Sequence, residues 1–105
     1  MAEWMTVARV EELGPGEREV YDIAGYWVAV FNVDGNYYAF EDACTHDDGP
    51  LAEGDLEGFE IICPRHGARF DIRTGEALTP PAITPTRRFQ VRVADGNVQL
   101  LVPED

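Results

Sequence analysis

The stretch 44-CTHDDGPLAEGDLEGFEIICPRH-66 begins with Cys44-x-His46 and ends with Cys63-x2-His66. The chain has two cysteines and two histidines, and all four lie in this stretch. Each end pairs a thiol with an imidazole, and these are ligands that zinc and iron–sulfur centres take from proteins. The stretch therefore predicts a metal site with two sulfur and two nitrogen ligands.

A disulfide between Cys44 and Cys63 is the alternative. A structural disulfide does not require a histidine two or three residues from each cysteine. Residues 1–10 lack the basic start and apolar run of a signal peptide, so we expect a cytoplasmic protein, where metal is favoured over a disulfide. No stretch approaches the ~20 apolar residues of a membrane helix, and we expect no membrane association.

Length and charge restrict the other function classes. The 105 residues predict a single domain over residues 1–105. The formal net charge of −12 argues against nucleic-acid binding, which needs a basic face. Residues 41–60 contain eight Asp or Glu, which form either a solvated surface or a docking patch for a basic partner.

The sequence outside this stretch predicts a β scaffold. Residues 26–33 (YWVAVFNV) are rich in aromatic and β-branched residues and are followed by an Asp-Gly-Asn hairpin turn. Residues 45–57 are expected to be loop, and 80–85 a stiff proline-rich connector. About nine short strands and no helix indicate an all-β antiparallel sandwich or barrel, with the two ligand loops forming a smaller lobe at about 43–82. The other strands are expected at 4–10, 19–24, 37–42, 59–62, 68–72, 76–78, 89–93 and 98–102.

Two metal groups suit this ligand set. Tetrahedral Zn²⁺ is one, and a [2Fe–2S] cluster with two cysteines on one iron and two histidines on the other is the second. Two thiolates neutralise the +2 core of an oxidised cluster, but they also neutralise Zn²⁺, so charge alone leaves both open.

The two ligand segments, CTHDDGPL and CPRHGARFD, resemble those of the Rieske [2Fe–2S] family, and the likeness continues through Thr74-Gly75 and the proline-rich segment. It implies a Rieske-type β base with a small cluster-binding lobe and one [2Fe–2S] cluster. Carried over residue by residue, Cys44 and Cys63 would hold the inner iron, and His46 and His66 the outer one.

The chain departs from the family pattern at two positions near the second ligand pair. High-potential members resemble one another in a Ser after the last Gly and a Tyr two residues on, both of which donate hydrogen bonds to sulfur. Ala68 and Phe70 stand there in this chain. Fewer such bonds stabilise the reduced cluster less, so we predict a potential near the low end of the Rieske range, roughly −150 mV.

The resemblance implies an electron carrier and not an enzyme. The sequence has no Gly-rich dinucleotide motif, and both histidines are used by the predicted cluster. The implied role is a monomeric Rieske ferredoxin that passes electrons from an NAD(P)H-dependent flavin reductase to a terminal dioxygenase-type oxygenase. The alternatives are the small Rieske-like subunit of an NADH-dependent nitrite reductase and a zinc-stabilised interaction module without redox activity.

Two groups of residues outside the ligands are also singled out. Arg65, Arg69 and Arg73 follow the second ligand loop, where they either contact a partner or neutralise nearby acids. The aromatic side chains of Trp4, Tyr26, Trp27 and Phe31 are expected to serve core and edge packing.

Overall fold

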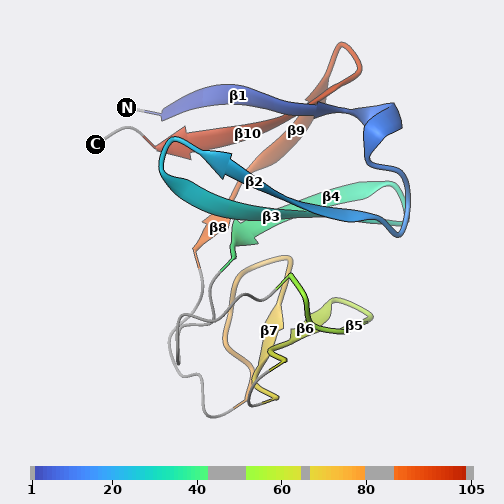
Figure 1. Cartoon of the computed structure of the whole chain (residues 1–105), viewed down its shortest axis with the longest axis vertical. Helices are drawn as coiled ribbons and strands as arrows, with labels where there is room; N and C mark the ends of the chain where they lie inside the picture. Colours follow the sequence, from blue (N-terminus) through green and yellow to red (C-terminus); the bar gives the residue numbers. More distant parts are fainter. Residues whose placement is uncertain (1, 43–51, 65–66, 80–86, 104–105) are drawn as a thin grey trace.

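The computed structural model describes residues 2–42, 52–64, 67–79 and 87–103, and within them the fold is three antiparallel sheets (Figure 1). Two sheets form a base with strand orders β1-β10-β9 and β2-β3-β4-β8. The third, β5-β6-β7, forms a lobe below them. The elements are β1 (Ala2–Arg9), the 3-10 turn η1 (Val10–Glu12), β2 (Arg18–Ile23), β3 (Tyr26–Val33), β4 (Asn36–Glu41), β5 (Leu56–Glu57), β6 (Glu60–Ile62), β7 (Arg69–Asp71), β8 (Arg88–Phe89), β9 (Val91–Ala94) and β10 (Asn97–Pro103).

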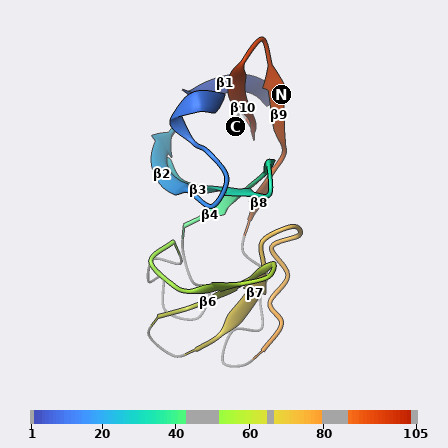
Figure 2. The same ribbon diagram turned by 90° about the vertical axis from the view of Figure 1, so that its right-hand side faces the viewer.

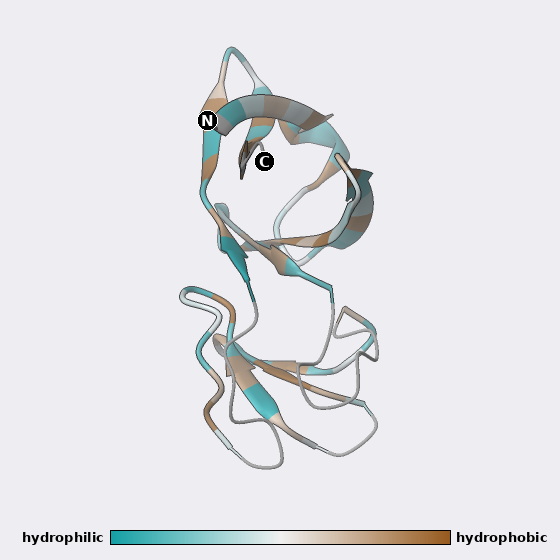
Figure 3. Cartoon of the chain, turned by 90° about the vertical axis from the view of Figure 1, so that its left-hand side faces the viewer, coloured by the Kyte–Doolittle hydropathy of each residue, from teal (hydrophilic) through white to brown (hydrophobic). Residues whose placement is uncertain are grey.

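Two buried clusters lie on opposite faces of β3, which explains why that strand is apolar without alternation. Val28 and Val30 face the cluster inside the base, where Leu100 of β10 meets them. Ala29 and Phe31 face the cluster shared with the lobe, where the ring of Phe31 stacks on Phe40 at 5.3 Å between centroids. Hydrophobic segments accordingly lie on strands of both the base and the lobe (Figure 3).

Tight hairpins set the register of the base. Ile23 pairs with Tyr26 across the two-residue turn Ala24-Gly25, and both turn residues have positive φ, 50° and 86°. This is the turn geometry whose twist matches that of the flanking strands. Only Gly, which has no Cβ, and Asn or Asp, whose short polar side chains bond locally, adopt this conformation readily. Ala24 has neither property, so its positive φ costs free energy.

Replacing Ala24 by Asn is therefore expected to stabilise the protein. The gain should be about 0.5–1 kcal/mol in the free energy of unfolding, because the left-handed conformation costs roughly 1–2 kcal/mol for an ordinary residue. Urea denaturation measures it, with Ala24→Val as the opposite control that should lower the midpoint. An Asn variant no more stable than the wild type would contradict the assignment of strain to this turn.

The strand predicted at 89–93 is two strands, and this part of the prediction is wrong. Phe89 pairs with Ala39 of β4, whereas Val91 pairs with Leu100 of β10 in the other base sheet. Gln90 marks the break, and its carbonyl still accepts a hydrogen bond from the Leu101 N–H at 3.0 Å. The chain thus changes sheet at Gln90, which an alternating pattern cannot reveal.

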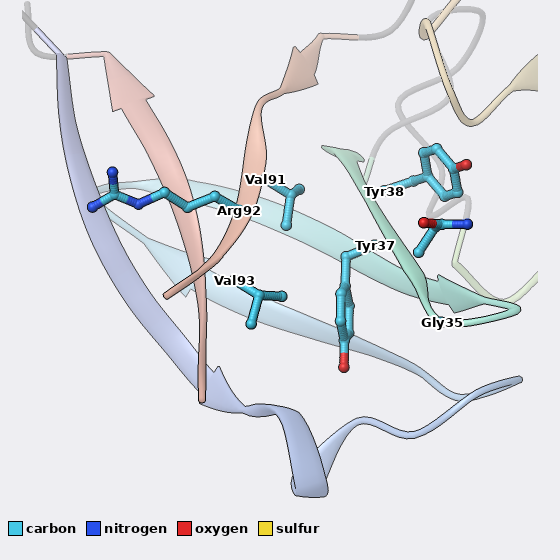
Figure 4. Close-up of a pocket in the computed structure, with 7 residues that line it drawn as sticks. Gly35, Tyr37, Tyr38, Val91, Arg92 and Val93 are labelled. Carbon is cyan, nitrogen blue, oxygen red and sulfur yellow. The ribbon is translucent and has the colours of Figure 1, made fainter. Parts of the chain in front are cut away.

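The change of sheet opens a seam between β4 and β9. Continuing the β4–β8 register would place Val91 opposite Tyr37, but β9 turns away towards β10. The space left between them has a volume of about 270 Å³ (Figure 4). In Figure 4, Tyr37 and Tyr38 point in opposite directions from β4, as successive strand residues do. The lining residues are Gly35, Asn36, Tyr37, Tyr38, Val91, Arg92 and Val93.

The lobe is inserted between two neighbouring strands of the base. β4 leads towards it and β8 leads away, and Figure 2 shows these two strands side by side above the lobe. The Glu41 N–H donates to the carbonyl of Arg87 at 2.7 Å, which continues the pairing beyond β8. Within the segment predicted as loop, Leu56–Glu57 is in fact the short strand β5, paired with β6.

The structure also shows where the aromatic residues expected to serve packing lie. Phe31 is in the core, but Trp27 is 60% exposed, so its assignment to packing is wrong. Trp4 is partly buried and lies under the guanidinium of Arg92, with Arg92 Cζ 4.2 Å from the ring centroid.

No helix within the described parts of the chain has the length and apolar character needed to cross a membrane.

Candidate metal centre

Cys63 is placed at the end of β6 as a free, buried thiol. Its exposure is 1%, and it belongs to the apolar cluster shared by the lobe and the base. Ala68, Phe70 and Ala52 belong to the same cluster, and the first two are fully buried. A thiol in such surroundings is shielded from water and from exposed reductants or oxidants, which suits an inner ligand of a metal group.

Two backbone hydrogen bonds close the turn that Cys63 begins. The Cys63 N–H donates to the carbonyl of Ala68 at 2.7 Å, and the Gly67 N–H donates to the carbonyl of Cys63 at 3.0 Å. Gly67 has φ of 73°, although a Cβ at this position would meet nothing within 4 Å. Glycine is therefore needed here for backbone conformation and not for space. The turn holds the end of β6 and the start of β7 at a fixed separation.

A hollow beside Cys63 fits a bound group. Its volume is about 320 Å³, and it lies between the turn at Cys63 and the segment 53–55. Cys63 borders this space and is of the residue type whose thiolate holds [2Fe–2S] groups. The residues described here therefore fit such a group. The lining residues are Glu53, Gly54, Asp55, Ile62, Cys63, Pro64 and Gly67.

The other three predicted ligands, Cys44, His46 and His66, lie outside the described residues. The residues that border the first ligand segment are described, and a hydrogen bond joins them. The Asp42 carboxylate accepts the Ala52 N–H at 2.7 Å, and the Asp42 N–H donates to the carbonyl of Trp27 at 2.7 Å. Both borders of the segment are thus tied to the same corner of the base.

Arg18 of β2 is a residue that sequence reasoning missed. Its Nη1 donates to the carbonyls of Ala52 at 3.0 Å and Gly54 at 2.6 Å. The guanidinium also lies over the Phe31 ring, 4.8 Å from its centroid. No local signal marks this role, because an Arg in an alternating strand reads as an ordinary surface residue.

A further contact between the base and the lobe is aromatic. Tyr38 of β4 meets Phe59 of the lobe edge to face at 5.8 Å, and Arg73 Cζ lies 4.3 Å from the centroid of the same Phe59 ring. The Arg73 guanidinium donates to both oxygens of Asp71, at 3.0 and 2.9 Å. These hydrogen bonds hold the pKa of the Asp71 carboxyl below its usual value.

The arginines after the second ligand loop pair with acids of the lobe. Arg69 Nη1 lies 2.9 Å from Glu57 and 3.4 Å from Glu60, which links all three strands of the lobe sheet. Arg73 pairs with Asp71 at 2.9 Å, so the expectation that these arginines neutralise nearby acids is confirmed for Arg69 and Arg73. Arg65 lies outside the described residues.

Comparison with known proteins adds a family and a function class to this geometry. The family model described as the Rieske [2Fe-2S] domain matches residues 3–94. The 3-phenylpropionate/cinnamic acid dioxygenase ferredoxin subunit of Photorhabdus laumondii is 38% identical over 100 residues, which are 94% of each chain.

Two solved structures show the same fold. The ferredoxin of carbazole 1,9a-dioxygenase from Nocardioides aromaticivorans IC177 superposes with a TM-score of 0.88 at 32% identity, covering 96% of this chain and 98% of its own. A complex of reduced oxygenase and oxidized ferredoxin in carbazole 1,9a-dioxygenase contains a chain with a TM-score of 0.87 at 33% identity, covering 97% of both. These matches favour a ferredoxin over the nitrite-reductase subunit and the zinc module.

Proposed function

The chain belongs to the Rieske [2Fe–2S] domain family, and we propose that it is the ferredoxin of a ring-hydroxylating dioxygenase system, a one-electron carrier and not itself an enzyme. The observation that carries this is the match to a dioxygenase ferredoxin subunit over 94% of both chains. A match to a carrier of about the same size, over nearly all of its length, supports the role that such a subunit has in its system. The bound [2Fe–2S] cluster supplies the one-electron chemistry.

The proposed ligands are the four residues singled out in the sequence. Cys44 and Cys63 bind the inner iron, and His46 and His66 bind the outer one. The burial and free thiol of Cys63 support its place in this set. The Ala68, Phe70 and Ile61 side chains exclude water from the lobe side of that thiol, since each is fully buried. A dry setting with fixed dipoles lowers the reorganisation that accompanies a change of charge.

The proposed partners are a terminal oxygenase and a flavin-dependent reductase. A solved complex pairs a carbazole dioxygenase oxygenase with its ferredoxin, which supports the first partner. The second follows from the need of a one-electron carrier for a donor. We propose that the chain is a monomer of one domain, residues 1–105, with its cluster lobe at about 43–82, and that it works in the cytoplasm.

Electron paramagnetic resonance of the reduced protein tests the ligand set directly. Mixed thiolate and imidazole ligation is expected to lower the average g below that of an all-cysteine cluster, with two irons and two labile sulfides per chain. Conversion of any one of the four ligands to Ala should reduce bound iron to about one tenth of the wild-type content or less, because an incomplete set leaves an iron unsatisfied.

A matched control shortens a buried apolar side chain of the lobe that does not line the hollow. Ile72→Val is such a change and should keep the full iron content. A wild-type spectrum typical of four cysteine ligands, or zinc in place of iron and sulfide, would rule out the proposed site. Electron delivery from a flavin reductase to a dioxygenase oxygenase, in the reconstituted system, tests the role as carrier.

A further inference from the structure

The side chain of Arg18 joins the base to the lobe at one point. One nitrogen, Nη1, uses its two N–H bonds on two carbonyls, those of Ala52 and Gly54. Charged donors form stronger hydrogen bonds than neutral ones, and both acceptors lie in the segment that follows the first ligand pair in the sequence. Phe31 supports the guanidinium from below, at 4.8 Å from its centroid. The contact with the Phe31 ring thus fixes the guanidinium, and the two hydrogen bonds fix the lobe segment to it.

The segment that Arg18 holds is itself bonded to the second ligand hairpin. Asp55 follows Gly54, and its carbonyl accepts the Ile62 N–H at 2.9 Å. Cys63 is the next residue, and it lines the same hollow as Gly54 and Asp55. A path of two hydrogen bonds and short covalent links thus leads from Arg18 to Cys63.

The same segment is bonded at its other end to the chain that enters the first ligand pair. The Ala52 N–H donates to the Asp42 carboxylate at 2.7 Å while the Ala52 carbonyl accepts from Arg18. Ala52 is 7% exposed, so both of its backbone groups are satisfied away from bulk water. Ala52 consequently connects the entry to the first ligand pair with the base strand β2.

We propose that Arg18 is a positioning residue for the cluster: it fixes the segment 52–55 against β2 and so holds both ligand-bearing segments in the spacing that retains the iron. This rests on the proposed ligand set. Arg18 does not touch the cluster in this scheme and acts through Ala52, Gly54 and Asp55. No charged side chain elsewhere among the described residues donates to the segment 52–54.

The test compares the rate at which visible absorbance decays in excess iron chelator. Arg18→Met keeps the apolar stem over Phe31 but removes both hydrogen bonds, and its cluster should be lost about tenfold faster than that of the wild type. Arg18→Lys keeps the charge on a side chain one bond shorter, so it should restore part of the retention. The control Arg92→Met removes a cation that stacks on Trp4 and bonds Gln99 in the other base sheet, and its rate should stay within about twofold of wild type.

Amide hydrogen exchange distinguishes a positioning role of Arg18 from a general effect of the substitution on protein stability. In Arg18→Met, the Ala52 and Ile62 amides should exchange faster, while the Leu101 amide, bonded to Gln90 in the base, should be unchanged. A wild-type decay rate with unchanged Ala52 and Ile62 exchange would overturn the proposal, and so would an equal loss of protection at Leu101. The resonance spectrum of the wild type tests the ligand set separately, so the two ideas fail independently.

Discussion

When a chelator removes the iron, the backbone amides of β6 and β7 are expected to exchange much faster with solvent. The exchange rates of amides in β3 and β10 should be nearly unchanged. The lobe proposed at 43–82 has about the length below which a chain usually needs a metal or disulfides to fold. Its buried side chains, such as Ile61 and Phe70, lie in the cluster that the lobe shares with one face of β3, and not in the cluster inside the base that contains Val28 and Leu100. Binding energy of a structural metal is folding energy for such a unit.

The amides of Ile61 and Phe70 should exchange at least about a hundredfold faster in the apoprotein, while those of Val28 and Leu100 should change by less than about tenfold. Hydrogen exchange read by mass spectrometry or NMR measures both sets at once. The Cys63→Ala variant should reproduce the pattern without chelator, and Ile72→Val, at a buried lobe residue outside the hollow, should not. Equal loosening of β3 and β10 would show that base and lobe fold as one unit.

Introducing a hydroxyl beside the second ligand pair is expected to raise the reduction potential above the roughly −150 mV that we predict for the wild type. Ala68 follows Gly67 and is fully buried, and its carbonyl already accepts the Cys63 N–H at 2.7 Å. In Ala68→Ser, the new hydrogen bond should be stronger to the reduced, more negative cluster. Its full worth of about 1.5–3 kcal/mol sets an upper bound of roughly 60–130 mV on the rise for one electron. Phe70→Tyr should act in the same direction.

Protein-film voltammetry measures these shifts, and Ala77→Ser supplies the matched control. Ala77 is partly buried and forms a bridge with Phe70, but it lies outside the turn that holds Cys63. Its hydroxyl should leave the potential within about 20 mV of wild type, since hydrogen bonds to the cluster sulfurs, and not buried hydroxyls in general, tune it. A potential unmoved in both Ala68→Ser and Phe70→Tyr would refute the account of the low starting value.

Local patterns predicted the hairpins of the base well. β3 was expected at its observed bounds, 26–33, because aromatic and β-branched residues end at an Asp-Gly turn. The start of β4, within one residue, and the turn into β10 were expected for the same reason. The all-β class, predicted from strand composition and turn residues, is confirmed by the three antiparallel sheets. The small lobe, predicted from the two ligand loops, is confirmed by the sheet β5-β6-β7.

Features that depend on distant partners were not predictable. The break at Gln90 exists because β8 and β9 pair with different sheets, and the sequence is equally apolar on both sides of it. Trp27 reads as a core residue, yet it lies at the strand end where β2 offers only Asp22 opposite. In the candidate site, the thiol of Cys63 is buried and free, which agrees with its predicted role as a ligand. The roles of Cys44, His46 and His66 stay predictions.

The side-by-side ends of β4 and β8 make the lobe a graftable module. Because Glu41 and Arg87 are hydrogen-bonded neighbours in the base, the strands would remain a hairpin if a short turn replaced everything between them. The cost of closing a loop grows slowly with its length, so insertions of very different sizes are tolerated at such a junction. The cluster inside the base can therefore stay unchanged when the inserted segment is exchanged or enlarged, provided that the new segment still covers Ala29, Phe31 and Phe40.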